Sequence, residues 1–125
     1  MLRDSEIDNA KKLTKDSLSD GPYHERNDCI RIAYEWLDAQ VKIKGTVSII
    51  YPVKHLIEKW AGRYVSTADV EVAAFMHPEI RGKYPRFNIS ARLTEPTIER
   101  LSNISEAFSH NYRKRFDPSV YKYHE

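Results

Sequence analysis

Six prolines divide this chain into short segments and limit the length of any one helix or strand. They stand at positions 22, 52, 78, 85, 96 and 118. Proline lacks a backbone N–H, so it suits the first turn of a helix but breaks a helix interior, and it biases the preceding residue away from helix. We therefore expect several short elements. The 125 residues fit one domain of about 100–200 residues.

Composition supports one core and excludes some classes of protein. Apolar residues make up 41% of the chain and charged residues 30%, which is not the composition of a disordered protein. The net charge of +2 does not by itself favour nucleic acid or acidic lipid, so any such binding must come from local patches. A lone cysteine, Cys29, and the lack of an apolar run or signal region predict a cytoplasmic protein with no membrane partner.

Apolar spacing predicts helices through the first part of the chain. Residues 2–19 carry a thin apolar stripe, which indicates either a packed helix or a loose arm. A core helix is expected over 23–41, and another over 53–61 with Gly62 as its C-cap. The Ser66 to Asp69 spacing matches a capping box, which begins a helix that runs to about Met76.

The sequence also predicts two strands and a further helix. Residues 46–51 are β-branched and bounded by Gly45 and Pro52, as expected of a short strand. Residues 86–93 alternate in polarity, which predicts a half-buried strand of a hairpin. An apolar stripe predicts a C-terminal helix within 94–117, before a tail at 118–125.

The order of these elements resembles the winged helix-turn-helix domain of DNA-binding proteins. The resemblance covers residues 22–93 and is carried by VKHLIEKWAGRYVSTADVEVAAFM, followed by the basic hairpin IRGKYPRFNISARL. It implies an α+β, mainly helical fold with a small β-hairpin as the wing. The N-terminal helical arm (1–21) and the additional C-terminal helix lie outside the resemblance. It also implies a small transcriptional regulator with double-stranded DNA as its partner. The small size of the chain suits a regulator of bacteria or phages.

The resemblance assigns the DNA contacts to basic and hydroxyl side chains around the two helices and the wing. Those near the helices are Lys54, Lys59, Arg63, Ser66 and Thr67. Those of the hairpin are Arg81, Lys83, Arg86 and Arg92. The alternative is that these cations form an ordinary solvated surface. A further basic run at 110–115 suits either a helix C-terminus or a phosphate clamp.

The C-terminal stripe predicts a homodimer. It consists of Ile98, Leu101, Ile104, Phe108 and Tyr112 at spacings of three and four. A second copy of the same helix would cover this stripe and place two winged domains on one duplex. Alternatively, the helix folds back over residues 2–18 of its own chain.

The second helix of the predicted helix-turn-helix also permits a different class of function. It carries Asp69 and Glu71 and has no Lys or Arg, and carboxylates near phosphates are repelled. The alternative is thus a protein-binding inhibitor or adaptor that docks through this acidic helix. An enzyme is not expected, because there is no phosphate-binding glycine loop, nucleophile elbow or histidine spacing typical of a metal site, and no cofactor is expected.

Overall fold

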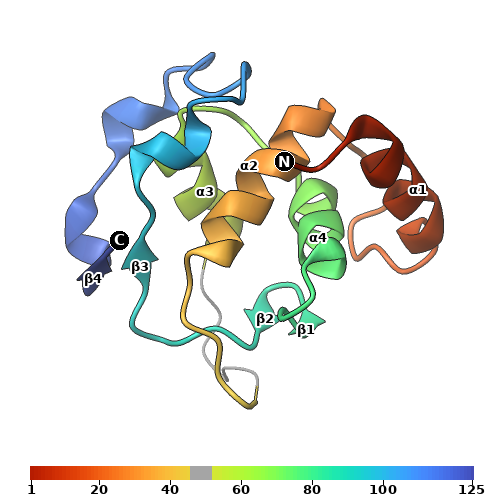
Figure 1. The fold of residues 1–125 in the computed structure, drawn as a ribbon, viewed down its shortest axis with the longest axis horizontal. Helices are drawn as coiled ribbons and strands as arrows, with labels where there is room; N and C mark the ends of the chain where they lie inside the picture. The colour runs from red at the N-terminus through yellow and green to blue at the C-terminus, as the bar shows by residue number, and fades with distance from the viewer. Residues whose placement is uncertain (46–51) are drawn as a thin grey trace.

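The fold of this protein is α+β and mainly helical. The computed structural model describes residues 1–45 and 52–125 (Figure 1). The predicted strand at 46–51 lies outside the described residues. In chain order the described elements are α1 Asp4–Thr14, α2 Asn27–Asp38, α3 Val53–Ala61, α4 Thr67–Met76, β1 Gly82–Lys83, β2 Arg86–Phe87, β3 Thr94–Glu95, the 3-10 turns η1 Ile98–Leu101, η2 Tyr112–Arg115 and η3 Pro118–Val120, and β4 Tyr123–His124.

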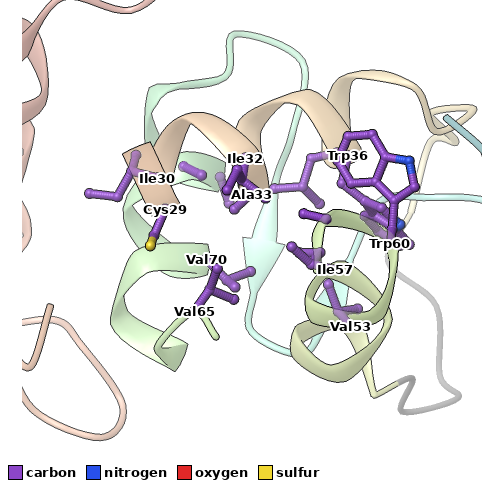
Figure 2. Packing of buried hydrophobic residues seen from close by; sticks show 14 of the residues in the cluster. Cys29, Ile30, Ile32, Ala33, Trp36, Val53, Ile57, Trp60, Val65 and Val70 are labelled. Atoms are coloured by element: carbon purple, nitrogen blue, oxygen red, sulfur yellow. The ribbon is translucent and has the colours of Figure 1, made fainter. Parts of the chain in front are cut away.

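The core is built around α2, which packs against both α3 and α4. Its buried face includes Cys29, Ile32 and Trp36, and Figure 2 shows these side chains between the helices. Trp36 of α2 and Trp60 of α3 are both fully buried. Burial of such side chains is the main favourable contribution to folding.

Helix α4 lies in the middle of the helical layer, against α1 and α2 (Figure 1). Its sequence, TADVEVAAFM, is small and apolar on nearly every side, as expected of a helix covered from several directions. Six of its ten residues are buried, and Phe75 is its one exposed residue, at 56%. Helix α1 supplies part of the cover through Ile7 and Ala10, so the N-terminal segment is a packed helix rather than a loose arm.

Local capping chemistry sets the ends of these helices, as the sequence predicts. The Ser66 hydroxyl accepts a hydrogen bond from the Asp69 amide, and the Asp69 carboxylate accepts one from the Ser66 amide, both at 3.0 Å. Gly62 ends α3 with φ of 63°, in the left-handed region. A Cβ there would also lie 3.1–3.3 Å from atoms of Phe108 and Arg113. Helix α2 is shorter than the predicted 23–41.

The predicted strand at 86–93 is wrong in extent. Only Arg86 and Phe87 pair in the hairpin with β1, and Ile89 forms an isolated bridge with Lys42. Alternation places Asn88 on the outer face, but it is 1% exposed. Its side-chain oxygen accepts from the Arg81 backbone N–H, and its side-chain nitrogen donates to the Glu79 carbonyl. These bonds satisfy backbone groups that would pair with a neighbouring strand if the strand were longer.

The predicted C-terminal helix is also wrong. The 94–117 segment contains two separate 3-10 turns, η1 and η2, and Phe108 between them has a φ of 62°. The residues between these turns favour local hydrogen bonds over helix; they include Ser102, Asn103, Ser105, Ser109 and Asn111. The Asp28 carboxylate fixes one bend by accepting from the Ser105 hydroxyl and the Glu106 amide.

The last residues are held against the core rather than left as a tail. Strand β4 pairs in parallel with β3, and the buried Tyr121 hydroxyl accepts from the Trp36 indole N–H at 3.0 Å. The Arg100 guanidinium donates to carboxylates of Glu35, Asp38 and Glu125. Arg100 therefore joins α2, η1 and the C-terminus.

The Arg100 cluster predicts an acid-sensitive contribution to stability. The hydrogen bond from Arg100 holds the pKa of Glu125 below its ordinary 4.5. A lowered carboxylate pKa stabilises the folded state fully above the unfolded value, and this stabilisation is lost as the pH falls through the folded value. We expect Arg100→Gln to lower the free energy of unfolding by about 2 kcal/mol near neutral pH.

Urea unfolding at a series of pH values measures this effect. The gap between Arg100→Gln and the wild type should narrow as the pH falls below about 4. Arg92→Gln is the matched control, since Arg92 is exposed and has no ion pair within the described part of the chain. A gap that is constant between neutral and acidic pH would contradict the prediction.

Candidate nucleic-acid interface

Two segments that lie side by side at the lower end of the molecule in Figure 1, residues 41–44 and 81–90, both carry exposed cations. Residues 41–43 run alongside 88–90, with the Ile43 amide donating to Asn88 and the Ser90 amide to Val41. The Arg81 guanidinium then donates to the Lys44 carbonyl at 3.1 Å. We call the resulting exposed group the hairpin surface; it consists of Lys44, Arg81, Lys83 and Arg86. Sequence patterns missed Lys44, because its neighbours lie far along the chain.

Intramolecular ion pairs do not neutralise the hairpin surface. Within residues 1–45 and 52–125, the ion pairs involve other cations of the chain, and none joins a carboxylate to this group. Glu79 is an exposed carboxylate on the same segment. Lys42 lies partly buried beside the surface and donates to the Asp38 carbonyl, and burial lowers its pKa. The hairpin surface therefore has a local excess of positive charge.

The hairpin that holds these cations is anchored to the core. Phe87 is 1% exposed and packs edge-on against Tyr84, with ring centroids 6.1 Å apart. Lys83 pairs with Arg86 in the ladder. Arg92 is exposed as well and follows the bridge at Ile89, outside the hairpin itself.

Two other cations predicted to contact DNA, Arg63 and Lys54, form ion pairs within the chain. Arg63 is 4% exposed, and its guanidinium contacts the carboxylates of Glu25 at 3.1 Å and Glu106 at 3.0 Å. Burial alone would lower the pKa of Arg63, but its charged surroundings outweigh this and raise it. Lys54 pairs with Glu58 at 2.9 Å, and Lys59 is partly buried. Arg63 is thus unavailable to a ligand in this fold.

The hydroxyl side chains predicted to contact DNA lie at the covered start of α4. Ser66 is buried, and its hydroxyl donates to the Tyr23 carbonyl at 2.8 Å while it caps the helix. Thr67 is partly buried. Because α4 is covered by α1 and α2, it presents no polar face that could enter a groove. Ser66 therefore has a structural role, and α4 offers no polar face for hydrogen bonds to base edges in a groove.

The acidic residues of α4 also face partners in the same chain. Asp69 is 0% exposed, and its carboxylate contacts His24 Nδ1 at 3.0 Å and accepts from the Glu25 amide. The Glu71 carboxylate accepts from both the amide and the hydroxyl of Ser19. An acidic docking face on this helix is therefore largely occupied by intramolecular contacts.

The residues predicted to form a dimer interface do not share one face. Leu101 and Ile104 are buried in the core of their own chain, at 3% and 4% exposure. Ile98 and Phe108 are exposed, at 45% and 48%, on different turns, and Tyr112 is partly buried. The predicted stripe breaks up because the segment is not one helix.

The basic run at 110–115 is partly committed to packing. Arg113 donates to the Trp60 carbonyl at 2.8 Å and lies 3.8 Å from the centre of the Phe116 ring. Lys114 and Arg115 are exposed. This segment, near η2, lies well away from the hairpin in Figure 1. It is a smaller basic patch than the hairpin surface.

The described residues suggest no other chemical centre. Among them, no group of three or more His, Cys, Asp or Glu side chains could hold a metal ion, and no helix is long and apolar enough to cross a membrane. Cys29 is buried, and burial raises its pKa to about 12, so the thiol stays protonated. Searches of family models, curated proteins and solved structures found no match to this chain.

Because the contacts of Arg63 are structural, we expect its substitution to lower the stability of the fold and to leave the charge of the hairpin surface unchanged. Arg63→Met leaves the Glu25 and Glu106 carboxylates without their guanidinium partner. We expect the free energy of unfolding to fall by about 2–3 kcal/mol, as for other charged hydrogen bonds. Lys59→Met is the matched control in α3 and should change it by less than about 1 kcal/mol. Equal urea midpoints for the two variants would show that the Arg63 contacts do not stabilise the fold.

Proposed function

We propose that this protein binds nucleic acid, in the first instance DNA, through phosphate contacts at the hairpin surface. The observation that carries the proposal is the group of exposed cations that meets there without intramolecular carboxylate partners. Phosphate contacts supply most of the affinity of non-specific DNA binding. Arg81 and Arg86 can each donate two parallel hydrogen bonds to a phosphate, and Lys83 and Lys44 add point charges.

The charge distribution favours this surface over the molecule as a whole. The net charge of the chain is only +2, so a uniform field would attract DNA weakly. Several of the other cations are paired in the chain, as with Arg31, Arg63 and Arg100. The hairpin surface gathers four exposed cations without an ion pair among the described residues, so we propose that phosphates bind there.

The proposed binding has little sequence preference. Phosphate contacts position a protein on DNA but carry no base information, which comes from groove contacts. Helix α4 is covered and offers none, so base readout at a defined operator would have to come from the hairpin itself. We therefore propose DNA binding with little sequence preference. A regulatory role at a defined operator would need base contacts from the hairpin.

Charge removal at the hairpin surface tests this proposal. In the variant Arg81→Gln, Lys83→Gln, Arg86→Gln, the buried Phe87 and Asn88 are untouched, so circular dichroism and thermal unfolding should match the wild type. We expect weaker DNA binding, with the slope of log affinity against log salt reduced by about 0.7–0.9 for each phosphate that the variant no longer binds. Fluorescence anisotropy of a labelled oligonucleotide at several salt concentrations measures both.

The control removes the same charge from another surface. The variant Lys114→Gln, Arg115→Gln, Lys122→Gln changes three exposed cations away from the hairpin. It should retain most of the affinity and the salt slope. Loss of binding in this control but not in the hairpin variant would overturn the proposal, and so would the absence of measurable DNA binding by the wild type at low salt.

A further inference from the structure

A groove adjoins the hairpin surface and is lined by side chains from three parts of the chain. It has a volume of about 280 Å³ and lies between the end of α1, the outer side of α4 and the hairpin. Leu18, Phe75, Tyr84 and Phe87 supply apolar and aromatic lining, and Lys83 supplies a cation. The groove therefore combines an aromatic wall with the edge of the cationic surface.

Among the residues that line this groove, Phe75 is the one whose exposure is least explained by packing within the chain. It belongs to the most buried helix of the fold, yet it is 56% exposed. Leaving a ring of this size in water forgoes a large part of its burial free energy. The exposed ring contributes little to the core and remains free to contact a ligand.

The charges at the groove favour a ligand that carries anionic groups beside a planar ring. Lys83 lines the groove, its ladder partner Arg86 lies beside it, and Arg81 is two residues before it. The one carboxylate in the lining, Glu71, already accepts hydrogen bonds from the Ser19 amide and hydroxyl. A nucleotide in a strand has this pattern, a flat base joined to a backbone of phosphates.

We infer that the groove accepts an unpaired base of single-stranded nucleic acid, stacked on Phe75, while the flanking phosphates contact Arg81, Lys83 and Arg86. This inference rests on the proposed function and names its preferred ligand. Bases of an intact duplex are paired and stacked on each other, so they cannot reach the ring without an unstacking cost of a few kcal/mol. Aromatic stacking tolerates any base, which agrees with binding of little sequence preference. The protein thus binds a single strand more tightly than a duplex of the same sequence.

Phe75→Leu and Phe75→Trp test the stacking directly. Phe75 is exposed, so neither change should alter thermal unfolding. Phe75→Leu keeps an apolar side chain but removes the ring, and it should weaken binding of a mixed-sequence single-stranded DNA about 5- to 50-fold while leaving the duplex affinity within about twofold. Phe75→Trp keeps a ring and should retain the affinity, and the single strand should quench the fluorescence of the introduced indole. Tyr123→Leu is the matched control, since Tyr123 is an aromatic residue 46% exposed on β4, outside the groove.

The outcomes separate this inference from the proposed function. Equal binding of the single strand by Phe75→Leu and the wild type would overturn the inference, and loss of both ligands in the hairpin glutamine variant would leave the proposed function standing. An equal loss of single-strand and duplex binding in Phe75→Leu would also overturn the inference. If sedimentation shows a wild-type dimer that Phe75→Leu dissociates, the groove holds a second copy of the chain and the inference is wrong. Failure of the wild type to bind either DNA would reject both proposals.

Discussion

The burial of α4 between α1 and α2 is the constraint on which the rest of the structure depends. A helix with apolar residues on nearly all sides gains most of its stability when neighbours cover it from several directions. Helix α2 covers one side of α4 and also packs against α3, while α1 in the N-terminal segment covers another side of α4. The chain after α4 leaves through His77, whose Nε2 lies 2.7 Å from an Asp38 carboxylate oxygen, and forms the hairpin. The second helix of the predicted helix-turn-helix is thus part of the core, and the hairpin next to it carries the exposed charge.

Buried polar contacts then decide which cations remain free. The Glu58 carboxylate caps the turn after α3 by accepting from the Val65 amide and from Lys54. Arg63 in the same turn bridges Glu25 and Glu106, which joins the segment before α2 to the C-terminal region. No buried side-chain polar atom in the described part of the chain lacks a hydrogen-bond partner. Since removal of one member of such a network leaves the others unsatisfied, these charges serve the fold rather than a ligand.

Sequence reasoning succeeded where the determinants are local and failed where they are not. The bounds of α3 and α4 agree with prediction because Gly62, Ser66 and Asp69 act within a few residues of themselves. The spacing of Leu101 and Ile104 predicted a helix, but both residues reach the core from separate turns of an irregular segment rich in Ser and Asn. The burial of Arg63 and Asn88 depends on partners far along the chain. In the sequence, the lack of a polar face in TADVEVAAFM indicates that α4 is covered on most sides. The same signal draws attention to Phe75, because an exposed aromatic ring is unexpected on such a helix.

In the binding that we propose, the hairpin surface and the groove contribute by different physical means. Contacts between cations and phosphates release counterions, so their contribution falls as salt rises. Stacking on an aromatic ring buries apolar surface and depends much less on ionic strength. Phe87 and Asn88 fix the hairpin against the core, so the cations are held in place before a ligand arrives and less conformational entropy is lost on binding. If a strand is held at both kinds of contact, as we propose, it keeps the affinity from stacking on Phe75 at salt concentrations that remove the phosphate contribution.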